Sequence, residues 1–352
     1  MITTLKFENF KGFQELNVSR LNRLNLFSGA NNVGKTSILE GIYLLSSREW
    51  KQASQLPNIF RSNISGYMNQ SGPDDATTFW QSLFFEGRLD LPVRISAMTD
   101  AGKELNCKLS AGDNPATAAL PERGDGAGVQ AKAATGPAYG TSNAPIAAFD
   151  LGSGVKGRIT GNTIAATFAV IANRFEQPIS DAELYNRVLL REGAEERLLA
   201  QLQLIEPRLT KLRYAKAPGT SQPLVYAHFG LKNALALPQA GRGFNKLFSL
   251  FAQMILSDAQ VVLIDGIEDS LCSETLPDIW KGIATLAAAA NIQVFATTYT
   301  RECVMAAHDA LKTLPNYDLT YHRIGRVNGR HEVVSHDAGR LETAIKTGLV
   351  IR

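Results

Sequence analysis

The chain has 352 residues, of which 45% are hydrophobic and 20% charged, a balance typical of a soluble globular protein with a sizeable core. Its net charge of +3 is too small to indicate a nucleic-acid partner by itself. The three cysteines lie far apart without metal-ligand spacing, which argues against a zinc site. Neither a signal peptide nor an apolar run of about 18 residues is visible, so we expect a cytoplasmic protein without a membrane partner.

The first 50 residues are predicted to form strands, a glycine-rich turn and a helix. Strand-like stretches run from Thr3 to Phe7 and from Arg23 to Ser28. After the turn, apolar residues recur at the spacing of a helix from Lys35 to about Ser46. A strand, a glycine turn and a helix in this order are the context that a phosphate-binding loop needs.

The middle of the chain changes in character along its length. Candidate strands at 92–98 and 104–109 flank a predicted hairpin turn at 99–103. Residues 111–143 are rich in Gly, Ala, Pro, Thr and Ser, which is typical of a flexible loop without a core of its own. Strand-like sequence returns at 158–170.

The last part of the chain alternates between helices and strands. A charged helix is predicted at 181–206, where Pro207 ends it. The apolar runs at 261–264 and 293–296 are typical of buried parallel strands, and a helix is predicted between them at 276–290.

The strongest motif is Gly-Ala-Asn-Asn-Val-Gly-Lys-Thr at residues 29–36, which fits GxxxxGK[ST] at every fixed position. The glycines let the backbone turn successive N–H groups inward, and the following helix adds its dipole. Lys35 supplies a charge for the β- and γ-phosphates of ATP, and Thr36 a hydroxyl for Mg²⁺. The predicted ATP-binding residues of this loop are Asn31, Asn32, Val33, Gly34, Lys35, Thr36 and Ser37.

A second signal is an aspartate at the end of a hydrophobic strand. Asp265 directly follows the apolar run at 261–264, which is the pattern of a Walker B segment. Such an aspartate holds Mg²⁺ through water. We therefore predict that Thr36 and Asp265 are the metal-binding residues.

Taken together, these segments resemble AAA-type ATPases with an ABC-like core, related to the OLD and SMC/RecF ATPases, many of them in bacterial anti-phage modules. Residues 2–13 resemble the first strand and its NFKGF turn, and residues 29–37 match GxNNxGKTS. Residues 80–85, 205–209 and 293–302 resemble the family's WxxLF, IEPR and QVFATTHSRE segments. The resemblance covers residues 1–50 and 200–352 well and the middle of the chain poorly.

The chain departs from the family at hydrolytic positions. Gly266 replaces the glutamate that polarises the attacking water, and Tyr299 replaces the switch histidine. Glu268 is a candidate substitute base, although the family already carries a glutamate there in another role. In the signature-like segment the glycines remain, and Arg242, next to Gly241, either contacts the γ-phosphate across a dimer or is a solvated arginine.

The resemblance and the motifs predict an α/β P-loop NTPase with an ABC-like core, in which a mixed, mostly parallel sheet is flanked by helices. We expect this core at 1–50 and 200–352, with an inserted β-rich and helical region at 51–199. ABC-like cores bind ATP between two protomers, so the resemblance implies a homo-oligomer in which Gly241 and Arg242 face the partner's ATP.

Three functions follow as hypotheses. The first is an ATP-dependent dimerising switch or sensor of an anti-phage module, with reduced or absent hydrolysis and a separately encoded nuclease as effector. The second is an active ATPase of the DNA-repair or defence type with a non-standard base. The third is a nucleic-acid-binding subunit like an SMC head, which the absence of sustained heptads disfavours.

Overall fold

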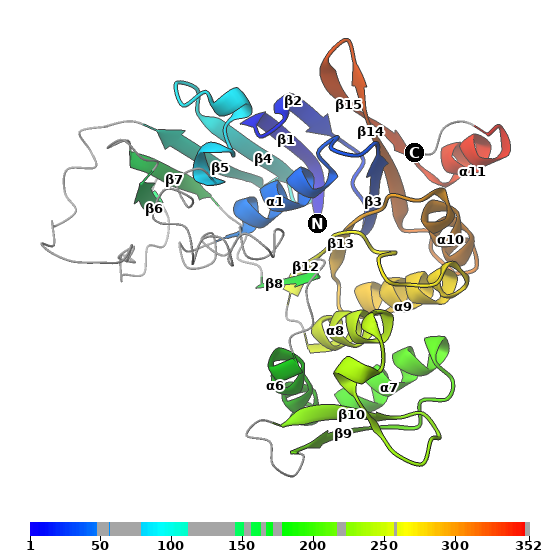
Figure 1. Cartoon of the computed structure of the whole chain (residues 1–352). Helices are drawn as coiled ribbons and strands as arrows, with labels where there is room; N and C mark the ends of the chain where they lie inside the picture. The colour runs from blue at the N-terminus through cyan, green and yellow to red at the C-terminus, as the bar shows by residue number, and fades with distance from the viewer. Residues whose placement is uncertain are drawn as a thin grey trace, which may run out of the picture. The chain divides into compact units, whose positions relative to one another are not determined.

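The computed structural model of the protein describes residues 1–47, 56, 79–111, 145–150, 156–162, 167–171, 178–216, 223–256 and 259–348. The chain folds into two compact units (Figure 1). The first comprises Met1–Leu21, Asn31–Ala165 and Ile324–Val334, and the second comprises Asn22–Ala30, Ala166–Arg323 and Ser335–Arg352. Apart from its first residue, the loop predicted at 111–143 lies outside the described residues.

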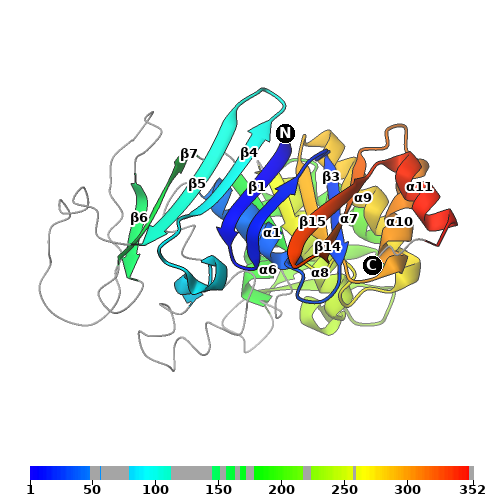
Figure 2. The ribbon, with the colours of Figure 1, turned by 90° about the horizontal axis from the view of Figure 1, so that it is seen from above.

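The first unit is built on a six-stranded antiparallel sheet in the order β2-β1-β4-β5-β7-β6 (Figures 1 and 2). The predicted hairpin turn between β4 and β5 is confirmed, because the Thr99 N–H donates to the Lys103 carbonyl at 3.0 Å. The strands of this sheet are β1 (Ile2–Phe10), β2 (Phe13–Val18), β4 (Val93–Thr99), β5 (Glu104–Ala111), β6 (Pro145–Asp150) and β7 (Lys156–Asn162).

Helix α1 (Lys35–Ser46) packs on this sheet and confirms the helix predicted from the apolar spacing. Its apolar side chains are buried together with Phe7 and Phe10 of β1, whose rings stack at 6.0 Å. Gly41 marks the closest approach, because a Cβ there would lie 2.4 Å from the Phe7 ring. The helix that follows the glycine-rich loop is thus fixed on the sheet by close packing.

A buried ion pair ties the turn between β1 and β2 to α1. The Lys11 ammonium pairs with the Glu40 carboxylate, and only 9% and 0% of these two side chains are exposed. The Lys11 N–H donates to the Leu83 carbonyl at 2.8 Å, and its ammonium lies 5.8 Å from the Phe79 ring centroid. Removing one partner of such a pair leaves a buried charge uncompensated, so the pair strongly favours this arrangement.

A second six-stranded sheet has the order β15-β14-β3-β13-β12-β8. Strands β3, β13, β12 and β8 run parallel, as expected for the apolar runs at 261–264 and 293–296. Strands β14 and β15 form a hairpin over Asn328 and Gly329, which both have positive φ. The strands are β3 (Leu24–Gly29), β8 (Thr167–Ile171), β12 (Ala259–Ile264), β13 (Gln293–Thr297), β14 (Leu319–Val327) and β15 (Arg330–His336).

Helices of the second unit bury large side chains around this sheet. Phe248 and Phe251 of α8 and Trp280 of α9 are fully buried in one apolar cluster with residues of β3, β12 and β13. The helices are α8 (Arg242–Leu256), α9 (Leu276–Ala289), α10 (Arg301–Lys312) and α11 (Ala338–Lys346). Among the helices in the described ranges, none is both long and apolar enough to cross a bilayer.

A small antiparallel sheet with two helices completes the second unit. The sheet consists of β9 (Lys211–Ala215), β10 (Leu224–His228) and β11 (Leu235–Ala236). The prediction of one helix at 181–206 is wrong, because the structure has α6 (Pro178–Leu189) and α7 (Ala194–Ile205). Gly193 lies between them as the N-cap of α7, with a φ of 68°, a left-handed conformation that glycine adopts without strain.

The strand-like sequence predicted at 158–170 is confirmed, and it belongs to two strands. β7 pairs with β5 in the antiparallel sheet, whereas β8 pairs with β12 in the parallel sheet. The segment 51–199, predicted as an insertion, therefore contributes strands to both large sheets. A sheet accepts any strand whose backbone groups pair, so sequence distance from the core does not decide membership.

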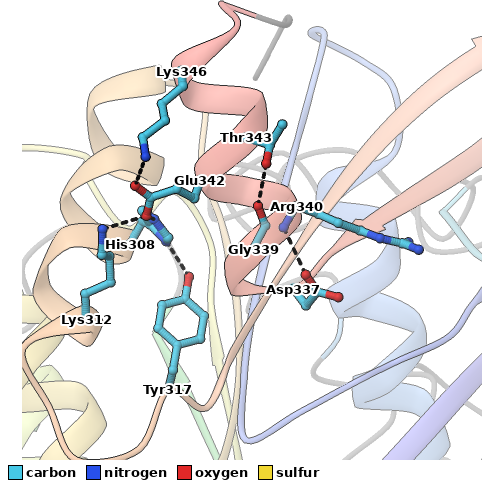
Figure 3. Close-up of polar contacts among 9 residues, drawn as sticks. All are labelled: His308, Lys312, Tyr317, Asp337, Gly339, Arg340, Glu342, Thr343 and Lys346. Carbon is cyan, nitrogen blue, oxygen red and sulfur yellow. Dashed lines mark hydrogen bonds and ion pairs between the residues drawn. The ribbon is translucent and has the colours of Figure 1, made fainter.

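Around His308, a polar cluster joins α10, the segment before β14 and α11 (Figure 3). His308 is buried, and its ring nitrogens lie 2.7 Å from the Tyr317 hydroxyl and 3.1 Å from Glu342 Oε2. Lys312 and Lys346 bind the same carboxylate at 2.5 and 2.9 Å. These partners lower the pKa of Glu342 to about 2, Lys312 having the largest effect. The carboxylate thus attaches α11 to α10.

We expect the stability contributed by Glu342 to depend on pH. Its pKa is lowered by folding, so the contribution is complete above the ordinary value of 4.5 and is lost as the pH falls toward 2. Melting temperatures of the wild type and Glu342→Gln should differ at pH 7 and converge below pH 4. Glu332→Gln, at an exposed position, is the control and should follow the wild type throughout. A difference that stays constant with pH would contradict this role.

Candidate functional site

The glycine-rich loop links β3 to α1 in the order that the motif predicted. Gly29, the last residue of β3, and Asn32 have φ values of 149° and 59°, so the loop turns through conformations that few residues adopt. Gly34 follows with a φ of 99° and is the N-cap of α1. Glycine has no side chain that could cap this helix end, and no side-chain cap hydrogen bond forms there.

Phe13 fixes the conformation of Gly34. A Cβ on Gly34 would lie 2.4 Å from the Phe13 ring, so only glycine fits at this position. The edge of the His331 ring in turn meets Phe13 at 5.0 Å between centroids. Next along the loop, Lys35 and Ser37 are buried to more than nine-tenths. The predicted phosphate-binding turn is therefore held by aromatic contacts from outside the motif.

Asp265 lies at the end of β12, as the Walker B pattern predicted, with 8% of its surface exposed. The Thr297 hydroxyl, at the end of the neighbouring strand β13, donates to Asp265 Oδ1 at 2.6 Å. The same hydroxyl accepts from the Gly266 N–H at 2.8 Å. Through these two hydrogen bonds, the Thr297 side chain of the adjacent parallel strand orients the Asp265 carboxylate.

A tight turn follows Asp265. The Asp269 N–H donates to the Gly266 carbonyl at 3.0 Å, which closes a four-residue turn. Gly266 has a φ of 56°, and a Cβ there would lie 2.1 Å from Asp269 Oδ2 and 3.0 Å from Tyr299 Cε2. The space that a side chain at position 266 would need is occupied by these two side chains.

Glu268, the candidate substitute base, contacts the segment after β13. Its Oε1 accepts from the Thr298 hydroxyl at 2.9 Å and from the Tyr299 N–H at 2.5 Å. Its Oε2 is buried and has no hydrogen-bond partner among the described residues. The carboxylate thus fixes the backbone at the position of the family's switch histidine.

The Tyr299 side chain lies among carboxylates and is 43% exposed. Burial, with the nearby charges of Asp265, Asp269 and Glu268, raises the pKa of Tyr299 to about 12. The phenol therefore keeps its proton at neutral pH and can donate a hydrogen bond but not act as a base.

Lys246 contacts the same turn, and the sequence did not single it out. Its ammonium reaches from α8 and donates to the Gly266 carbonyl at 2.5 Å and to the Asp269 carbonyl at 3.3 Å. Burial lowers the pKa of Lys246, and the neighbouring carboxylates, Asp269 first among them, oppose that effect. In the sequence, a lysine on an amphipathic helix is indistinguishable from a solvated one, so no signal marked it.

The signature-like segment lies beside the same turn. Gly241, with a φ of 97°, precedes α8, and Arg242 is the exposed first residue of that helix. A Cβ on Gly243 would lie 2.4 Å from the Ser270 carbonyl oxygen, so this glycine lets the helix approach the backbone after the Walker B turn. The second unit therefore brings the Walker B and signature-like segments together, whereas residues 31–37 belong to the first unit.

Comparisons with known proteins agree with these motifs. Residues 1–86 match the family described as AAA ATPase domain. The DNA replication and repair proteins RecF of Francisella tularensis subsp. mediasiatica (strain FSC147) and subsp. novicida (strain U112) are each 35% identical to this chain over 79 residues. Each match covers 22% of this chain and 23% of the RecF protein, so the chain matches about a quarter of the length of these relatives.

The fold is similar to that of SMC heads. The crystal structure of the SmcHead bound to the C-winged helix domain of ScpA has a TM-score of 0.56 at 11% identity. That comparison covers 98% of this chain and 99% of the other. The Smc head domain with an extended coiled coil, bound to the C-terminal domain of ScpA derived from Pyrococcus furiosus, has a TM-score of 0.50 at 12% identity, with 98% of each chain covered.

Residues 1–86 are thus similar to an AAA ATPase domain, and the chain resembles RecF in sequence over 79 residues and SMC heads in fold. The predicted fold class, an α/β P-loop core with a mixed sheet, is confirmed. Within the described residues, no group of three or more His, Cys, Asp or Glu side chains forms a metal site by itself.

We expect Gly266→Ala to destabilise the folded protein. The left-handed backbone costs a residue with a Cβ about 1–2 kcal/mol, and the overlap with Asp269 adds to it. Gly325→Ala is the matched control, because its Cβ meets no atom within 4 Å and its φ is not positive. Urea unfolding should show a loss for the first variant only, and adding Asp269→Ala should recover part of it. Equal midpoints for the two single variants would contradict the close packing at Gly266.

Proposed function

We propose that the chain binds ATP with Mg²⁺ at the glycine-rich loop. The observation that carries this is the N-cap of α1, where left-handed Gly34 opens the helix without a capping side chain. Backbone N–H groups at an uncapped helix start bind phosphate, and the helix dipole adds to the attraction. The residues that would hold the phosphates are Asn31, Asn32, Val33, Gly34, Lys35, Thr36 and Ser37.

Mg²⁺ would be held by the Thr36 hydroxyl and, through water, by Asp265. These oxygen donors suit a hard cation, and the Thr297 hydroxyl already orients the Asp265 carboxylate. When bound, the ion neutralises charge on the β- and γ-phosphates. Lys35 supplies the point charge that the protein itself contributes to them.

We infer further that hydrolysis is slow. Gly266 leaves the position of the family's glutamate without a carboxylate, and Asp269 and Tyr299 fill that space. A positioned base contributes about 10²–10⁴-fold to such a reaction. Tyr299 cannot take over proton abstraction, because its pKa of about 12 keeps the phenol protonated. ATP bound here therefore persists long enough to act as a switch.

The switch that we propose is association of copies of the chain around ATP. Arg242 begins α8 and Gly241 precedes it, both on the surface, where they can meet the γ-phosphate bound by a second copy. A ligand that contacts both copies shifts the population toward the dimer or a higher oligomer without being cleaved. Arg242 would then stabilise the charge on the partner's ATP in the manner of an arginine finger.

For the cellular role, we propose a cytoplasmic sensor in a bacterial anti-phage module that controls a separately encoded nuclease. The second candidate is a DNA-linked ATPase, favoured by the 35% identity over 79 residues to RecF, a protein named for DNA replication and repair. In that case the switch would respond to nucleic acid directly. ATP-strengthened, salt-weakened binding of duplex DNA would favour the second candidate.

Isothermal titration calorimetry with Mg·ATP tests the proposed site. Lys35→Ala should weaken ATP binding by about 10–100-fold, because a hydrogen bond to a charged group contributes about 1.5–3 kcal/mol. Lys232→Ala removes an exposed lysine and should bind like the wild type. If the wild type takes up no Mg·ATP, the proposed function is refuted.

A further inference from the structure

The small sheet of the second unit ends in an edge strand, β9. In the order β11-β10-β9, β9 has β10 as its only strand neighbour among the described residues. An edge strand presents backbone N–H and C=O groups with which a further strand can pair. We propose that β9 binds an acidic segment of a partner protein as an added β-strand. This surface lies outside the ATP-binding residues, so the inference goes beyond the proposed function and stands independently of it.

The sequence around β9 is basic and lacks acidic residues. Residues 207–257 contain seven Lys or Arg and no Asp or Glu, although the whole chain has 36 basic and 33 acidic residues. Lys211 and Arg213 are exposed on β9, and Lys216 is exposed one residue beyond its end. None of these three side chains forms an ion pair with a described residue. An acidic segment therefore meets positive charge there without displacing an ion pair of the described chain.

The two faces of β9 differ in character. Side chains alternate along a strand, so Lys211 and Arg213 share one face, and Leu212 and Tyr214 share the other. Helix α6 packs against this second face, where Leu212 is buried in one apolar cluster with Tyr185 of α6 (Figure 1). Tyr214 is 39% exposed on the same face. The strand thus offers positive charge on one face and a partly exposed aromatic ring on the other.

This alternation defines the chemistry of the segment that would fit. Residues of paired strands lie directly opposite one another, and opposite charges there stabilise the pair. The added strand therefore carries carboxylates at two alternate positions, opposite Lys211 and Arg213. The residues between them are apolar, because one of them covers the Tyr214 ring. Backbone pairing gives the affinity, and the alternate side chains give the specificity.

Two other occupants fit the strand less well. A second copy of β9 would bring Lys and Arg side chains opposite Lys and Arg, and like charges in paired strands are destabilising. A nucleic acid would contact the face that carries Lys211 and Arg213, but it would leave the backbone edge unpaired and Tyr214 on the far face uncovered. An acidic β-strand uses the charge, the ring and the edge together.

Fluorescence anisotropy with the full chain tests the proposal. The probe is a labelled peptide with the core Glu-Val-Glu-Val-Glu, which should bind saturably. The double variant Lys211→Glu with Arg213→Glu should raise its Kd at least about 10-fold, because placing like charges opposite one another costs several kcal/mol. The matched control is Lys103→Glu with Lys108→Glu, two exposed lysines of the β4–β5 hairpin. It changes the net charge equally and should leave the Kd within about 2-fold of the wild type.

The charge-reversed variant also provides a gain of binding. It should bind a peptide with the core Lys-Val-Lys-Val-Lys, which the wild type should not bind, because the opposite charges are restored in the same register. Such binding would show that the variant keeps its fold at β9.

Peptides methylated on backbone nitrogens report the pairing itself and need no protein variant. Along a strand, alternate residues direct their N–H groups to the same edge. Methylating either the Glu or the Val nitrogens therefore blocks one edge of the peptide only. One of the two methylated peptides should lose wild-type binding at least about 10-fold, and the other should keep it.

The remaining outcomes would overturn the proposal. They are no binding of the acidic peptide by the wild type, equal binding of the two methylated peptides, and equal weakening in the β9 and control variants. Tighter binding of oligothymidylate than of the peptide, lost in the β9 variant, would assign the surface to nucleic acid instead. Mg·ATP calorimetry concerns other residues, so this inference and the proposed function can fail separately.

Discussion

The turn that follows β12 concentrates negative charge, and the buried ammonium of Lys246 is what stabilises it. Three carboxylates lie within five residues of one another, at 265, 268 and 269. Like charges in a poorly solvated site repel, so such a turn needs a cation or strong hydrogen bonds. Lys246 supplies the cation and, by binding the carbonyl groups of Gly266 and Asp269, also determines the backbone conformation of the turn. The backbone conformation of the turn sets the positions of its three carboxylates.

Two departures from the family that look independent in the sequence are neighbours in space. Gly266 replaces the glutamate and Tyr299 the histidine, 33 positions further along the chain. In the structure a Cβ at 266 would lie 3.0 Å from the Tyr299 ring, so the larger aromatic side chain uses room that the glycine leaves. Glu268 binds the Tyr299 N–H and connects the two positions a second time. The two departures are therefore parts of one packed arrangement.

The glycine-rich loop before α1 depends in the same way on residues outside its motif. Phe13 packs against Gly34, and the Lys11–Glu40 pair attaches the turn before Phe13 to α1. Both contacts are buried within the first unit, where packing and charge pairing reinforce each other. The turn between β1 and β2 thus shapes the loop from a distance of about 20 residues along the chain.

The sequence by itself determined those parts of the structure that depend only on the spacing of residues within one segment. The GxxxxGK[ST] pattern, the apolar periodicity of α1 and the apolar runs of β12 and β13 each describe the conformation of their own segment. Asp265 was found the same way, because a carboxylate that ends a buried strand is visible without knowing its neighbours. Where a local break was overlooked, as at Gly193 between α6 and α7, the sequence did carry the signal.

Only the tertiary structure decided which segments meet. Nothing in residues 158–170 specifies that β7 joins one sheet and β8 the other, because strand pairing is chosen between segments far apart in the chain. The burial of Lys246 beneath the Walker B turn and the position of Asp269 over Gly266 likewise depend on a helix and a backbone turn brought together by folding. Hydrogen-bond partners and burial are properties of the assembled core, so a linear pattern of residue types does not contain them.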